Sequence, residues 1–108
     1  MKKPDKTATA HEYPAEWTFL TNHSHVLLCL AADGGLTLRE VAAKVSITER
    51  AVQKIVADLV ETGVIVRERA GRRNRYRINA DQPLRHPVES HRRVRDLIRM
   101  VHGRTSIA

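Results

Sequence analysis

The sequence predicts a mainly α-helical domain that carries one small β-hairpin. Four stretches place apolar residues at helical spacing, and one stretch alternates apolar and charged residues on either side of Ala70-Gly71, as two strands joined by a tight turn do. The helical stretches are residues 20–31, 38–45, 52–59 and 94–101. A chain of 108 residues makes one domain with a modest core.

The segment from Thr37 to Gly63 predicts two amphipathic helices separated by a tight turn. Thr37 is expected to cap the first helix, and Glu40 completes a capping box three residues later. Thr48 is expected to cap the second helix, and Gly63 to end it in a left-handed conformation. The apolar stripes that hold the pair together are Leu38, Val41, Ala42 and Val45, then Val52, Ile55, Val56 and Leu59.

The second helix of this pair has a polar outer face. At 100° per residue, Arg50, Gln53 and Lys54 point away from its apolar stripe. Arg and Gln side chains can form paired hydrogen bonds with base edges, and Lys can neutralise a phosphate. These residues lie in the N-terminal half of the helix, the half that contacts bases when such a helix enters a major groove.

Residues 64–79 predict an arginine-rich β-hairpin. Tyr76 and Ile78 are expected to face the core, and Arg75 and Arg77 to face outward. Arginine suits both the phosphate backbone and a narrow minor groove. The alternative is an edge hairpin that its charges merely keep soluble.

The run VAAKVSITERAVQKIVADLVETGVI, followed by this hairpin, resembles the winged helix-turn-helix of MarR-like and ArsR-like bacterial transcriptional regulators over about residues 21–79. The resemblance implies a three-helix core, a two-stranded wing and a C-terminal helix, with the second helix of the pair in the major groove. Ser46 departs from the glycine usual in that turn, and a left-handed non-glycine residue costs roughly 1–2 kcal/mol. The expected DNA-binding residues are Thr37, Arg39, Thr48, Glu49, Arg50, Gln53, Lys54, Arg69, Arg72, Arg73, Asn74 and Arg75.

Three parts are expected along the chain: a flexible basic tail at 1–14, the DNA-binding domain at 15–80, and a linker with a C-terminal helix at 81–108. Thr21 or Asn22 is expected to cap the first helix, and Pro87 to begin the last one, which Gly103 ends. The last helix can fold back on the first or pair with a second copy. We favour a homodimer, as in the regulators that the chain resembles. The expected interface residues are Trp17, Leu20, Leu27, His91, Val94, Leu97, Ile98 and Val101.

The charge balance favours an anionic partner. The net charge is +7, and double-stranded DNA is the expected partner. An interaction module for RNA or protein is the alternative, whereas no catalytic motif supports an enzyme. One cysteine and no apolar run of 18 residues fit a cytoplasmic protein.

Neither a cofactor nor a metal is expected. His23, His25 and Cys29 raise the hypothesis of a metal site, but they lack the spacing and the number of ligands that zinc needs. A small-molecule effector has no support in the sequence.

Overall fold

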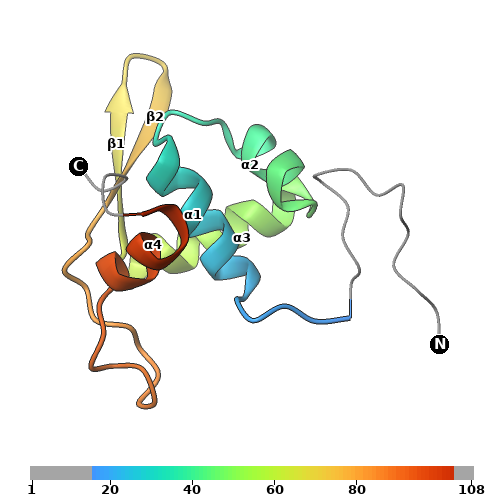
Figure 1. Cartoon of the computed structure of the whole chain (residues 1–108). Coiled ribbons are helices and arrows are strands. Elements are labelled where there is room, and N and C mark those ends of the chain that lie inside the picture. Colours follow the sequence, from blue (N-terminus) through green and yellow to red (C-terminus); the bar gives the residue numbers. More distant parts are fainter. Residues whose placement is uncertain (1–15, 104–108) are drawn as a thin grey trace.

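The computed structural model describes residues 16–103, so the tail expected at 1–14 lies outside the described residues. Four helices and a two-stranded antiparallel hairpin form a winged helix-turn-helix (Figure 1). In chain order they are α1 (Asn22–Ala32), α2 (Leu38–Val45), α3 (Glu49–Glu61), β1 (Ile65–Ala70), β2 (Arg73–Ile78) and α4 (Val94–His102). α1 is the central element, because it contacts α2, α3, β2 and α4.

Side-chain caps begin the first three helices. The Thr21 hydroxyl accepts a hydrogen bond from the backbone N–H of Ser24 and so caps α1. Thr37 and Glu40 form the predicted capping box of α2, and Thr48 caps α3. Each cap stabilises its helix by about 1 kcal/mol, which matters for helices this short.

The turn between α2 and α3 is left-handed at Ser46. Its φ of 67° and ψ of 43° confirm the strain that the missing glycine predicts. The backbone N–H groups of Ser46 and Ile47 both donate to the carbonyl of Ala42, at 2.8 and 3.2 Å, so the turn closes tightly onto α2.

The core lies where the apolar stripes of α2 and α3 meet α1. Its most deeply buried side chains come from all four helices and from β1. They are Val26, Leu30, Val41, Val52, Val56, Ile65, Val94 and Ile98. Burial of each of these side chains stabilises the fold by about 1.5–3 kcal/mol. Because α3 is packed through its apolar face, its polar face is held in a fixed orientation.

The hairpin is anchored to the loop between α1 and α2. The backbone N–H of Tyr76 donates to the Gly34 carbonyl at 2.9 Å, so this loop runs along the free edge of β2. Gly34 is required there, since a Cβ would lie 2.3 Å from the Tyr76 carbonyl oxygen. The sequence predicts only a turn at Asp33-Gly34-Gly35. The hydrogen bond between this turn and β2 is seen only in the structure. Tyr76 is buried and Ile78 half-buried, as predicted.

α4 begins later than predicted, at Val94 instead of Pro87. The segment before it is bound as a second ladder: Leu84 N–H donates to the Arg92 carbonyl, and Val94 N–H to the Gln82 carbonyl, both at 2.9 Å. These long-range bonds outweigh the local preference for a helix that proline supplies. The expected end of the helix at Gly103 is confirmed.

α4 folds back on α1 of the same subunit. Val94 and Ile98 are buried there, and His102 donates from Nε2 to the Leu28 carbonyl at 2.8 Å. Of the two expected arrangements, the structure thus shows that α4 folds back on α1, through the side that carries Val94 and Ile98.

Candidate nucleic-acid interface

The outer face of α3 is free. Arg50, Gln53 and Lys54 are exposed, and among residues 16–103 none of their side chains forms a hydrogen bond or ion pair. Ala57 continues this face with a small side chain that leaves room for close approach. The face therefore offers guanidinium, amide and ammonium donors to an external partner.

Residues at the starts of α2 and α3 surround that face. Arg39 and Glu49 are exposed, and so are the two capping residues, Thr37 and Thr48. The hydroxyls of both threonines already accept hydrogen bonds from backbone N–H groups at the starts of their helices, at 3.1 and 3.0 Å. The hydrogen bonds from Thr37, first from its backbone N–H, lower the pKa of the Glu40 carboxyl.

The hairpin carries the second basic surface. All five residues expected to bind DNA there are exposed: Arg69, Arg72, Arg73, Asn74 and Arg75. The Arg73 guanidinium donates from Nη2 to the Gly35 carbonyl at 2.7 Å. Arg67 and Arg77 are also exposed on the hairpin, on opposite faces of it, and were not among the expected residues. The alternation of side chains between the two faces of the strands was the signal that could have identified both residues.

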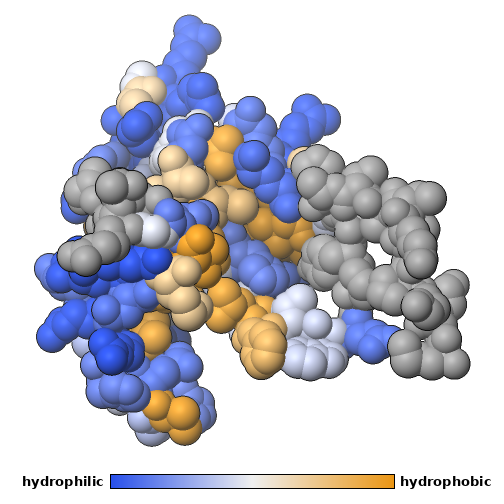
Figure 2. Space-filling model, in the orientation of Figure 1, coloured by the Kyte–Doolittle hydropathy of each residue, from blue (hydrophilic) through white to orange (hydrophobic). Residues whose placement is uncertain are grey.

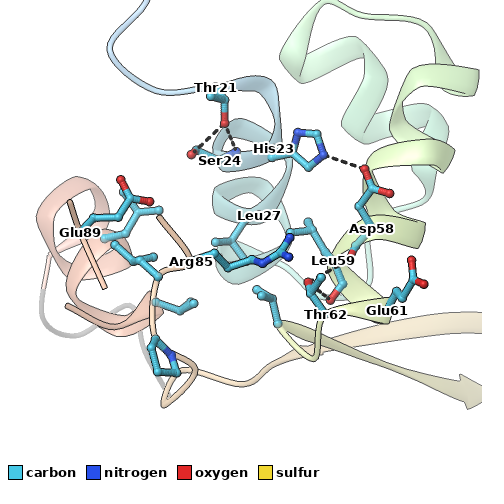
Figure 3. Close-up of a pocket in the computed structure, with 15 residues that line it drawn as sticks. Thr21, His23, Ser24, Leu27, Asp58, Leu59, Glu61, Thr62, Arg85 and Glu89 are labelled. Atoms are coloured by element: carbon cyan, nitrogen blue, oxygen red, sulfur yellow. Dashed lines mark hydrogen bonds and ion pairs between the residues drawn. The ribbon is translucent and has the colours of Figure 1, made fainter. Parts of the chain in front are cut away.

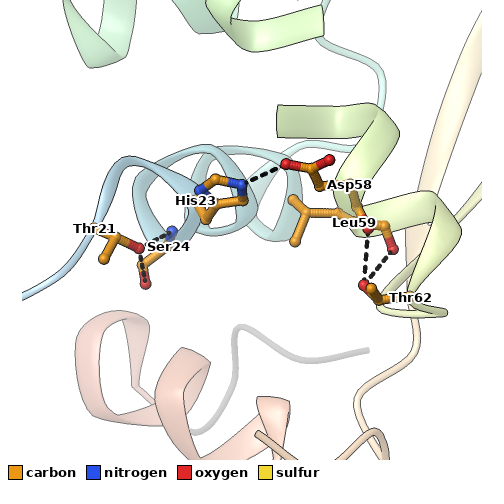
Figure 4. A network of polar contacts seen from close by, with 6 residues as sticks. All are labelled: Thr21, His23, Ser24, Asp58, Leu59 and Thr62. Carbon is orange, nitrogen blue, oxygen red and sulfur yellow. Dashed lines mark hydrogen bonds and ion pairs between the residues drawn. The ribbon is translucent and has the colours of Figure 1, made fainter. Parts of the chain in front are cut away.

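The other end of α3 is held by α1. His23 Nε2 lies 2.9 Å from Asp58 Oδ2, and this hydrogen bond lowers the pKa of the Asp58 carboxyl (Figure 4). The Thr62 hydroxyl donates to the Asp58 carbonyl at 2.8 Å and closes the last turn. The polar face of the N-terminal half of α3 therefore has no partner among residues 16–103, while the C-terminal half is bonded to α1.

A cleft of about 600 Å³ opens beside this anchor, between α1, α3, α4 and the link before α4 (Figure 3). Its floor is apolar and includes Leu27 and Leu59, and Arg85 extends into it from the link. Glu61 and Glu89 also line it, so its rim carries charges of both signs.

The residues expected at a dimer interface divide into two groups. Leu27, Val94 and Ile98 are buried within the subunit, which removes them from the surface offered to a second copy. The others lie at the surface or are half-buried: Trp17, Leu20, His91, Leu97 and Val101. Phe19, expected like Trp17 to be a core or interface anchor, is 90% exposed, and Met100, which was not expected, is 68% exposed. Figure 2 shows apolar side chains gathered over α4, α1 and the segment before α1.

The residues that raised the metal hypothesis have other surroundings. His23 contacts Asp58, and His25 Nδ1 lies 3.3 Å from the Asn22 side-chain oxygen. Cys29 is half-buried, and burial raises the pKa of its thiol. Within residues 16–103, His, Cys, Asp and Glu side chains do not gather in threes that could hold a metal ion. No helix in the described part of the chain has the length and hydropathy to span a bilayer.

Comparison with known proteins supports the fold. No curated protein matches the chain significantly. Residues 20–66, somewhat under half of the chain, match the model of a family described as winged helix-turn-helix DNA-binding. The matched segment contains α1, α2, α3 and the start of β1, and so includes the free face of α3. The chain therefore contains a winged helix-turn-helix similar to those of DNA-binding domains.

Proposed function

We propose that this protein is a sequence-specific transcriptional regulator, not an enzyme, that binds double-stranded DNA in the cytoplasm. The observation that carries the proposal is the free face of α3, where Arg50, Gln53 and Lys54 lie exposed on a helix whose other side is packed in the core. The match of residues 20–66 to DNA-binding domains supports it.

In this proposal the N-terminal half of α3 enters the major groove. Arg50 and Gln53 contact base edges, each contributing about 1–3 kcal/mol of discrimination if both hydrogen bonds form. Lys54 contacts phosphate. The hairpin arginines whose side chains have no hydrogen-bond partner among residues 16–103 lie along the backbone or in the adjacent minor groove. Five to seven phosphate contacts per subunit would make affinity fall with salt at a log–log slope of roughly −5 to −6.

We further propose a homodimer related by a two-fold axis, formed through the exposed apolar surface of α4 and the segment before α1. Phe19, Met100 and Val101 are the anchors, since large apolar side chains are rarely left this exposed together. A two-fold axis would place two α3 helices about 34 Å apart, which is one turn of DNA. The preferred site is then an inverted repeat.

Charge reversal on α3 tests the proposal. Arg50→Glu and Lys54→Glu should each abolish tight duplex binding, measured by fluorescence anisotropy on sites selected from a random duplex library. Arg92→Glu, which makes the same change in net charge on the link before α4, is the matched control and should bind with nearly normal affinity. Unchanged binding by the α3 variants would reject this face as the DNA-binding surface.

A parallel titration with structured RNA at the same salt concentration tests the alternative. Preference for the duplex supports the regulator. Preference for RNA would favour the winged-helix interaction module instead.

A further inference from the structure

We propose that the two faces of the hairpin have different tasks: Arg67 and Arg69 contact the DNA backbone, whereas Arg73 holds the hairpin on the loop before α2 and Arg77 pairs with Glu68 within the hairpin. The inner face is defined here as Ile65, Arg67, Arg69, Asn74, Tyr76 and Ile78, and the outer face as Val66, Glu68, Arg73, Arg75 and Arg77. This inference rests on the proposed function and adds Arg67, which sequence reasoning did not single out.

The strand register separates the two faces. Arg67 pairs with Tyr76 and Arg69 with Asn74, so these four side chains lie on one side of the sheet. Tyr76 and Ile65 are 6% and 1% exposed, which shows that this side turns toward the helices. β1 follows α3 directly and packs against it. The inner face therefore packs on α3 through β1 and on α1 through β2, and Arg67 and Arg69 lie on its exposed part.

Arg67 is oriented for an external anion. Its guanidinium lies 6.0 Å from the centroid of the Tyr76 ring, within the range of a cation–π contact. That contact positions the guanidinium plane without using its N–H groups. Among the described residues neither Arg67 nor Arg69 forms a hydrogen bond through its side chain. Their donors are free to form the paired contacts that phosphate oxygens accept.

Two arginines of the outer face, Arg73 and Arg77, are already engaged. Arg73 donates to the Gly35 carbonyl at 2.7 Å, and Arg77 donates from Nε to Glu68 at 3.1 Å. A DNA contact by Arg73 would require breaking the bond that fixes the hairpin on the loop before α2, and a DNA contact by Arg77 would require breaking its ion pair with Glu68.

Single alanine variants separate the two tasks. Anisotropy titrations of the full chain with one mixed-sequence duplex, over a series of salt concentrations, give both the affinity and the salt slope. Arg67→Ala and Arg77→Ala change the net charge equally, so long-range attraction falls equally in both. Thermal unfolding of each variant confirms that the binding data come from folded protein.

The expected result differs between the faces. One lost phosphate contact lowers the salt slope by about 0.9, which is about eightfold in affinity at 0.1 M salt if the contact contributes nothing at 1 M. Arg67→Ala and Arg69→Ala should show that loss, and Arg77→Ala should stay within about twofold of the original chain. Arg67→Lys keeps the charge and should keep the slope.

The inference would be overturned, with the proposed function intact, by an Arg67→Ala variant that binds normally or by an Arg77→Ala variant that loses as much as Arg67→Ala. A slope that falls as far with lysine as with alanine would also reject a phosphate contact at Arg67. If the original chain shows no salt-dependent duplex binding, both the proposed function and this inference fail.

Discussion

Replacing Gly34 with alanine should uncouple the hairpin from the helical body. The added Cβ would lie 2.3 Å from the Tyr76 carbonyl oxygen, where ordinary contact begins at about 3.4 Å. The obstacle is the backbone of β2, so it cannot turn aside as a flexible side chain can. β2 must therefore move away by about 1 Å, and the hydrogen bond from Tyr76 N–H to the Gly34 carbonyl, 2.9 Å long, is lost.

The two costs add to a measurable loss of stability. The hydrogen bond contributes about 0.5–1.5 kcal/mol, and forcing an extra methyl group into packed structure costs about 1–3 kcal/mol. Gly34→Ala should thus lower the free energy of unfolding by about 1.5–4.5 kcal/mol. In a domain of this size the unfolding midpoint should fall by at least about 6 °C.

The neighbouring glycine supplies the control. A Cβ at Gly35 would meet the Arg75 guanidinium at 3.2 Å, which is the far end of a flexible side chain. Gly35→Ala should therefore change the unfolding free energy by no more than about 0.5 kcal/mol. Thermal and urea unfolding followed by circular dichroism measure both variants. Equal stability of the Gly34 variant and the original chain, or equal damage at both positions, would refute the proposed anchoring of the hairpin.

Three further predictions concern the helices. Ser46→Gly should raise the urea-unfolding free energy by about 0.5–1 kcal/mol, because relief of the left-handed strain exceeds the entropy that glycine adds to the unfolded chain; a loss of stability would contradict this. Hydrogen bonds from Thr37 lower the pKa of Glu40 below 4.5, so its carboxylate stabilises the fold above that pH and loses the contribution as the pH falls through the lowered pKa. Glu40→Gln should therefore destabilise the fold near neutral pH, and the deficit in unfolding free energy should shrink in acid; a deficit independent of pH would argue against the capping carboxylate. Met100→Asp together with Val101→Asp should convert the proposed dimer to monomer in sedimentation velocity, whereas an unchanged mass would place any dimer contact elsewhere.

Local signals accounted for most of the fold. Thr21, Thr37 and Thr48 cap their helices as predicted, because a cap involves residues only three positions apart. The exposure of Arg50 and Gln53 also followed from helix geometry once the apolar stripe was known. What these residues bind is a separate question, which the proposed binding experiments address.

Long-range pairing explains what the sequence did not predict. Pro87 carries a local signal for a helix start. On either side of it, however, residues 82–84 and 92–94 are joined to each other by backbone hydrogen bonds, which hold the link out of a helix. Gly34 looks like an ordinary turn glycine until β2 is known to run beside it. Arg67 was missed because its position over Tyr76 depends on a register set by the tight turn at Gly71 and Arg72.

The half-buried Cys29 gives the chain its own chemical reporter. It is the single cysteine of the sequence, and it lines an apolar hollow of about 350 Å³ together with His102, whose hydrogen bond to Leu28 ties the end of α4 to α1. Burial raises the pKa of this thiol, which slows its alkylation. A substitution that loosens the packing around Cys29 should therefore speed its reaction with a neutral maleimide, without any added label.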